Sequence, residues 1–218
     1  ALPIYLIHAE LDDEVTSGDN ITHIYQSFLD SRPRSFENNA VKLMIDLSIK
    51  HKCRVHIVHL SSSDVLEDLA KTKATSSLIS VETCPHYLII ESEDIPDGKT
   101  LFKCCPPIRE KENKEKLWQG LKAGIIDFIV SDHSPCTPQL KCLQEGDLGK
   151  AWGGISSLQF GISLIWTEMR KRGMSITELF EYMSKKTSSF IGLESSHGQI
   201  KIGLRADFVV FDPEHEYV

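Results

Sequence analysis

The sequence has no long apolar run and no excess of positive charge. None of its apolar stretches approaches the length of about 18 residues that a membrane-spanning helix needs. The chain carries 24 Lys and Arg against 31 Asp and Glu, which gives a net charge of −7. No basic patch indicates binding to nucleic acid or to an anionic membrane surface. The composition therefore predicts neither nucleic acid nor a membrane as a partner.

Cysteines with the spacing of a zinc or redox motif are also missing. The sequence has 6 cysteines but no C-x-x-C pair. Because 41% of the 218 residues are hydrophobic, the chain can bury a core without the help of disulfides. We therefore predict reduced, mostly buried thiols and no structural zinc site built on cysteines.

The first ten residues, "ALPIYLIHAE", lack the basic region and the cleavage site of a secretory signal. They also lack an initiator Met and open directly into an apolar strand pattern. We therefore expect the chain to be part of a longer protein. We expect that protein to be cytoplasmic or organellar (mitochondrial or peroxisomal) rather than secreted, and the sequence does not choose between these compartments.

Short apolar runs alternate with amphipathic helical patterns along the chain. This alternation is typical of a parallel sheet with helices on both faces. Four such units predict half of an eight-stranded barrel. The predicted strands are 3–10, 53–62, 77–90, 125–134 and short strands within 198–218, and the predicted helices are 35–52, 62–74, 113–124, 154–173 and 175–192.

Three polar residues close predicted strands. His8 ends the first strand, His59 the second and Asp132 the fourth. In a parallel barrel all three would lie on one rim, and two imidazoles with a carboxylate are good ligands for zinc. A carboxylate beside a bound water can also take its proton. The alternative is that these are hydrogen-bonded core histidines and a turn-forming Asp; His56, deeper in its strand, is expected to pack.

Seven segments in order extend over nearly the whole chain and resemble one family. Together they are similar to the cyclic-amide branch of the amidohydrolase superfamily, and most of all to the allantoinases. Dihydropyrimidinases share "HAE" and the "CP-Y" pattern but differ after the Asp-His pair. The segments are "LIHAE", "HIVHLSS", "ETCPHYL", "KCCPPIRE", "SDHSPC", "AWGGISSLQ" and "GLRADFVVFD".

The resemblance implies an α/β fold, the C-terminal half of a (β/α)8 TIM-like barrel plus strands of a small β-domain. Residues 1–192 would form barrel strands five to eight with their helices, and residues 193–218 the C-terminal strands of the small β-domain. It also implies two zinc ions per subunit in the full-length protein. The carboxylated lysine and the His-x-His pair that complete this site in the family have no matching position here.

The resemblance implies roles for individual residues. His8 and His59 match the metal ligands of strands five and six, and Asp132 matches the strand-eight ligand that also acts as catalytic base and then acid. Cys105, His133 and Ser156 match positions near the substrate; Cys105 stands where many relatives have Ser.

The implied activity is opening of the hydantoin ring of allantoin to allantoate by a homo-oligomeric enzyme. We expect residues 1–218 alone to be inactive. Two alternatives stay open: a dihydropyrimidinase-like hydrolase, and a non-catalytic truncated or assembly homologue.

Overall fold

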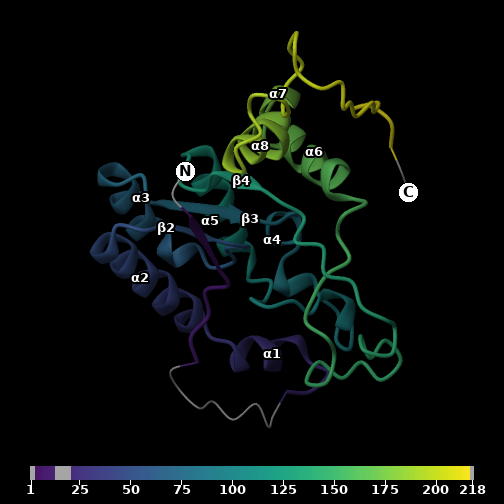
Figure 1. The fold of residues 1–218 in the computed structure, drawn as a ribbon. Coiled ribbons are helices and arrows are strands. Elements are labelled where there is room, and N and C mark those ends of the chain that lie inside the picture. Colours follow the sequence, from purple (N-terminus) through teal and green to yellow (C-terminus); the bar gives the residue numbers. More distant parts are fainter. Residues whose placement is uncertain (1–2, 13–20, 217–218) are drawn as a thin grey trace.

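The computed structural model describes residues 3–12 and 21–216. Its centre is a four-stranded parallel sheet in the order β1-β2-β3-β4 (Figure 1). In register, Ile4 pairs with Arg54, Val55 with Ile79, and Glu82 with Phe128. The predicted parallel α/β architecture is confirmed. The strands are β1 (Ile4–Ile7), β2 (Arg54–Ile57), β3 (Ile79–Thr83) and β4 (Phe128–Ile129).

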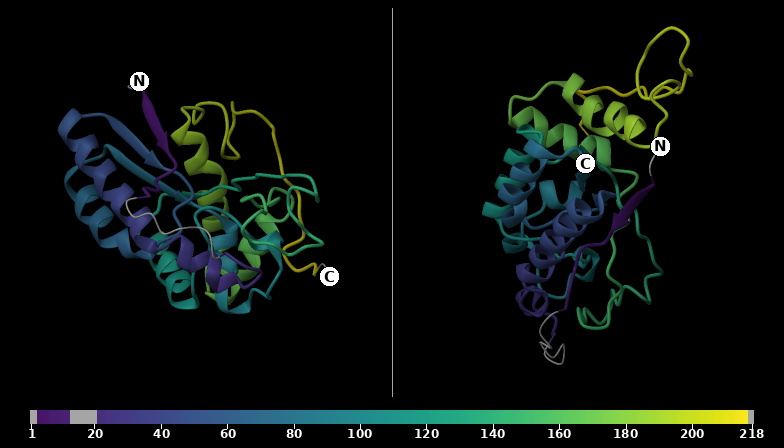
Figure 2. Two further views of the ribbon diagram at one scale, coloured as in Figure 1. Left: turned by 90° about the horizontal axis from the view of Figure 1, so that it is seen from below. Right: turned by 60° about the vertical axis from the view of Figure 1, so that its left-hand side comes forward.

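Helices α2 and α3 lie side by side against the sheet (Figure 2). The α-helices are α1 (Tyr25–Ser31), α2 (Arg34–His51), α3 (Leu66–Thr75), α4 (Pro85–Ile89), α5 (Lys111–Lys122), α6 (Gly161–Lys171), α7 (Ile176–Phe180) and α8 (Lys186–Phe190). Between them lie the 3₁₀ turns η2 (Ser63–Val65), η3 (Ser92–Asp94) and η4 (Thr100–Phe102) and the π-helical turn η5 (Glu181–Lys185).

The core lies between the sheet and these helices because both contribute apolar faces. Val55 and Ile57 of β2 are buried, as are Val41 of α2 and Leu69 of α3. On the other face of the sheet His56 is fully buried, so its expected packing role is confirmed. Its ring nitrogens contact Ser80 Oγ and Glu82 Oε2 at 2.7 and 3.0 Å.

Two predicted strands are shorter than expected. The strand predicted over 77–90 ends at Thr83, and α4 follows it, because Pro85 favours the first turn of a helix over a central strand. The strand predicted over 125–134 is reduced to the two residues of β4. Helix α1 was not predicted from the sequence.

The short strands predicted within 198–218 do not form in 198–216, and residues 217–218 lie outside the described part. The segment instead runs away from the sheet as an irregular trace (yellow in Figures 1 and 2). Ile202 and Val210 are almost fully exposed. A strand needs a partner for its backbone groups, and strand-like residue types alone do not supply one. The assignment of 193–218 to a small β-domain stays a prediction.

Within the described ranges, no helix combines the length and the apolar character that crossing a bilayer requires.

Candidate metal centre at the carboxyl end of the sheet

His8 and His59 meet where two neighbouring parallel strands end. His8 follows β1 and His59 follows β2, and His8 Nδ1 lies 3.0 Å from His59 Nε2. The two rings are 4.8 Å apart in an edge-to-face arrangement. His59 adopts a left-handed backbone conformation with φ of 43°, which turns the chain sharply at the strand end. The structure thus brings two of the three predicted ligands together.

The second ring nitrogen of His8 is held by Glu10. His8 Nε2 lies 3.0 Å from Glu10 Oε2, and Arg32 Nη2 donates to the same oxygen at 2.7 Å. Burial raises the pKa of Glu10, but the hydrogen bonds to His8 and Arg32 outweigh burial and lower it. The ionised carboxylate accepts the Nε2 proton of His8 and thereby leaves the Nδ1 lone pair facing His59.

His59 is buried and neutral. Burial lowers the pKa of His59, with His8 acting in the same direction, whereas the charge of Asp132 opposes the shift. The Nδ1 atom of His59 is buried and has no hydrogen-bond partner among residues 3–12 and 21–216. Neutral imidazole is the form that binds metals, so the side chain is in the state that a ligand needs.

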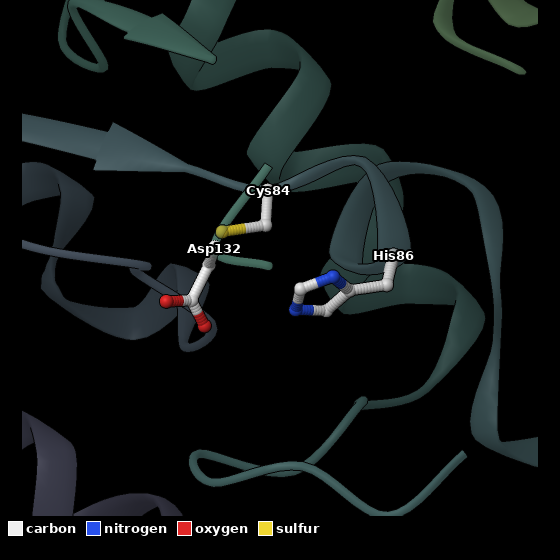
Figure 3. Close-up of side chains that lie close together, drawn as sticks. All are labelled: Cys84, His86 and Asp132. Atoms are coloured by element: carbon white, nitrogen blue, oxygen red, sulfur yellow. The ribbon is translucent and has the colours of Figure 1, made fainter. Parts of the chain in front are cut away.

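Asp132 follows β4 with a left-handed φ of 45°. Its carboxylate lies with Cys84 and His86 in a group whose potential ligand atoms are all within 4.8 Å of one another (Figure 3). The charge of Asp132 also acts on His59. The site therefore divides into a His8–His59 pair and a Cys84–His86–Asp132 group, and the joint ligand role predicted for His8, His59 and Asp132 stays a prediction.

The donor set fits a borderline divalent metal such as zinc. A zinc ion with bonds of about 2.0–2.1 Å to two imidazoles would place their nitrogens roughly 3.3 Å apart. The nitrogens of His8 and His59 lie at 3.0 Å, close to that separation. These two residues would hold the ion through Nδ1 and Nε2 respectively.

Comparison with known proteins identifies the family of the chain. The amidohydrolase family matches residues 6–217, which is nearly the whole chain. The chain belongs to the amidohydrolase family. The predicted fold class is thereby confirmed.

The curated relatives of this amidohydrolase chain include several allantoinases, which confirms the predicted resemblance. "Allantoinase, mitochondrial" of Aquarana catesbeiana is 52% identical over 193 residues, covering 87% of this chain and 40% of the relative. The allantoinase of Saccharomyces cerevisiae is 43% identical over 213 residues, covering 95% of this chain and 45% of the relative. The chain thus spans less than half the length of these relatives.

Solved structures similar to the amidohydrolase chain include hydantoinases. The L-hydantoinase (dihydropyrimidinase) from Arthrobacter aurescens matches with a TM-score of 0.86 at 25% identity, covering 93% of this chain and 46% of that one. A D-hydantoinase from Bacillus sp. AR9 matches with a TM-score of 0.82 at 28% identity, covering 94% and 46%.

The loop after Asp132 is fastened to the segment that contains Ser156. His133 Nδ1 accepts hydrogen bonds from the backbone N–H groups of Ser157 and Leu158 at 3.1 and 3.2 Å. His133 and Ile155 form a parallel bridge. His133 therefore orders the backbone next to Ser156, whose side chain is exposed. The substrate contacts predicted for both residues stay predictions.

Cys105 lies against the same segment. A Cβ atom on Gly153 would lie 3.0 Å from Cys105 Sγ, so the thiol packs tightly against this glycine. Burial raises the pKa of the Cys105 thiol, so this side chain is neutral. Its predicted role beside the substrate stays a prediction.

The buried side chain of Lys141 holds two backbone segments together, one at Lys103 and one at Trp152 to Gly154. Its buried ammonium donates to the carbonyl oxygens of Lys103 and Trp152 at 2.8 and 2.9 Å, and also to that of Gly154. Burial lowers the pKa of Lys141. Sequence reasoning missed this residue because its three acceptors become neighbours only in the fold.

Glu37 supports the turn that follows His59. This fully buried carboxylate accepts hydrogen bonds from the backbone N–H groups of Ser61 and Ser62 at 2.8 and 2.7 Å. Burial raises the pKa of Glu37 to about 7. The sequence offers one signal of this supporting role: Glu37 lies on the buried side of the helix predicted over 35–52, where a carboxylate is unusual.

Cys84 and His86 were not predicted as site residues. Their segment "ETCPHYL" contributed only to the family resemblance. Their convergence depends on α4 beginning at Pro85, directly after β3.

Proposed function

We propose that this chain forms part of the active site of a metal-dependent hydrolase that opens the hydantoin ring of allantoin to allantoate. The observation that carries the proposal is the His8–His59 pair at the carboxyl end of a parallel sheet. We propose allantoin as the substrate because the chain is 36–52% identical to curated allantoinases.

In this proposal His8 and His59 bind zinc, and Asp132 contributes a carboxylate oxygen. Two zinc ions per subunit follow from the resemblance, which also implies further ligands without a matching position in this chain. The Glu10 carboxylate fixes the orientation of His8 and favours binding through Nδ1. When bound, the metal supplies Lewis-acid chemistry at the ring carbonyl.

In this proposal Asp132 acts first as the general base and then as the general acid. Its carboxylate accepts a proton from the water that attacks the ring carbonyl carbon, and a C–O bond forms. The ring C–N bond then breaks, and the same proton passes from Asp132 to the departing nitrogen. His133, Ser156 and Cys105 would face the substrate from the loops that surround Asp132.

A second candidate is hydrolysis of a dihydropyrimidine or a simple hydantoin. The similar solved structures are hydantoinases and dihydropyrimidinases with TM-scores of 0.78–0.86. Identities of 23–28% to these structures are lower than those to the allantoinases. Allantoin is therefore the favoured substrate.

A substrate panel separates the two candidates. The protein that contains this chain should be assayed with allantoin, hydantoin and dihydrouracil, with and without a chelator. We expect allantoin to give the highest kcat/KM and the chelator to abolish turnover. Preference for dihydrouracil would favour the second candidate, and no turnover of any ring after zinc addition would support a non-catalytic homologue.

The compartment and the assembly are also proposals. A mitochondrial allantoinase among the relatives supports an organellar location, mitochondrial or peroxisomal, with the cytoplasm as the alternative. Homo-oligomerisation follows from the family resemblance. Cell fractionation and sedimentation of the purified protein test these two points.

A further inference from the structure

We propose that Cys84, His86 and Asp132 form a binding site for a thiophilic divalent cation, which competes with the His8–His59 site for the Asp132 carboxylate. Cadmium and zinc are the ions that best suit one sulfur, one imidazole and one carboxylate. The binding part of this proposal is independent of the proposed function. Its consequence, inhibition by such ions, rests on that function.

The first observation is the convergence of three different donors. Cys84 is the N-cap of α4, His86 lies in the first turn of that helix, and Asp132 follows β4. In Figure 3 the sulfur of Cys84 and the ring of His86 both point toward the Asp132 carboxylate. Their potential ligand atoms lie within 4.8 Å of one another.

The second observation is that His86 has no hydrogen-bond partner in the described part of the chain. Its side chain is 3% exposed, and neither ring nitrogen forms a hydrogen bond there. Buried polar groups without partners are rare in folded proteins and call for an explanation. A cation bound by the imidazole supplies one, because the ring is aimed into the group of donors.

The geometry needs only a small contraction. Tetrahedral zinc with bonds of about 2.3 Å to sulfur and 2.0 Å to nitrogen holds its ligand atoms roughly 3.3–3.5 Å apart. Cys84 and His86 are buried, whereas Asp132 is exposed, so the contraction requires movement mainly of the Asp132 side chain. Three protein ligands leave one position open to water. On binding, the thiol proton of Cys84 is released to solvent.

The shared carboxylate links this site to the catalytic one. A cation held between Cys84 and His86 engages the carboxylate that the proposed mechanism uses to move a proton. Occupation of this site therefore withdraws the base. Burial lowers the pKa of His86 to about 3, and His59 acts in the same direction, so the two sites are near neighbours.

The test is a titration of the metal-depleted protein with Cd²⁺, followed by sulfur-to-cadmium charge-transfer absorption. We expect a saturable band at one equivalent, no band in Cys84→Ser or Cys84→Ala, and at least tenfold weaker binding in His86→Asn. Cys104→Ser is the matched control, since Cys104 is also buried but lies outside the group, and it should retain the band. His8→Asn should retain it as well.

Two results would overturn the proposal. One is cadmium binding without a sulfur band in the wild type. The other is a band of equal strength and affinity in folded Cys84→Ser, with folding checked by circular dichroism. If the protein also opens allantoin, Cd²⁺ inhibition should be at least tenfold weaker in Cys84→Ser. If it opens no ring amide, the absorption titration still decides on the binding site.

Discussion

Ile57 and Ile202 carry the same side chain in opposite surroundings. Ile57 lies in β2 and is fully buried, whereas Ile202 lies in the C-terminal segment and is fully exposed. β2 has a parallel partner on each side, and the described part of the C-terminal segment pairs with no strand. Apolar composition predicts a strand in both regions, but a strand forms only where neighbouring backbone groups complete it.

The centre of the sheet also positions the site, whereas the described part of the C-terminal segment, up to residue 216, positions none of its residues. The first prediction therefore compares Asp132→Asn with Asp212→Asn. An amide at position 132 cannot accept the proton of water, so turnover of allantoin should fall about 10²–10⁴-fold. Asp212→Asn should leave kcat/KM unchanged. Equal activity of both variants would remove Asp132 from the role of base.

The second prediction tests the buried and exposed isoleucines directly. Ile57→Ala removes buried methylene groups and leaves a cavity, so the free energy of unfolding should fall by about 2–5 kcal/mol. Ile202→Ala should change it by less than about 0.5 kcal/mol. Denaturant unfolding of both variants measures the difference. A similar loss in both would show that Ile202 is buried in solution.

The third prediction concerns pH and the buried carboxylate beneath the site. The pKa of Glu37 is raised to about 7 from a usual value of 4.5. Between these pH values the folded state keeps a proton that the unfolded state has lost. The contribution of protonated Glu37 to the free energy of unfolding is therefore fully present below about pH 4.5. It is lost as pH rises to about 7, with a slope of at most about 1.4 kcal/mol per pH unit.

Glu37→Gln removes this titration, so the stability difference between wild type and variant should change across that window and stay constant above it. Glu214→Gln, in the exposed C-terminal segment, is the control for the loss of one acidic side chain. A pH-independent difference for Glu37→Gln would mean that Glu37 has an ordinary pKa in the folded protein.

The smallest expected effect concerns the free edge of β1. Tyr5 and Leu6 are more than half exposed, and β1 pairs only with β2 among the described strands. Unpaired apolar edges promote association, and a lysine on such an edge opposes it. The 218-residue chain should therefore self-associate, and Leu6→Lys should reduce this, as measured by sedimentation. Association unchanged in Leu6→Lys would exclude this edge as the contact.

The sequence was sufficient to predict the parallel sheet and the proximity of His8 and His59. The apolar runs before His8 and His59 identify strand ends, and parallel strands bring their carboxyl ends to one edge. The sequence did not predict the contacts that join distant segments of the chain. Nothing in the sequence indicates that Lys141 reaches the carbonyls of Lys103 and Trp152, because those acceptors converge only after folding.

Two other differences between the predicted and the observed secondary structure concern the segment after β3 and the C-terminal segment. Apolar residues continue through "ETCPHYLII", which suggests one long strand, but Pro85 starts a helix and turns His86 toward Asp132. In the C-terminal segment the residues of "ADFVVFD" favour a strand, yet it has no partner in the described structure. Sequence periodicity reports which residues suit a sheet, and not whether a neighbouring strand is present.

Metal restoration in wild type and His59→Gln tests the central claim most directly. The protein that contains this chain should be stripped with a chelator, titrated with zinc and assayed for allantoin opening at each zinc concentration. The account predicts that zinc restores turnover in the wild type, whereas His59→Gln stays at least 100-fold less active at the same zinc concentrations. Full recovery of His59→Gln with the wild-type zinc dependence would contradict it.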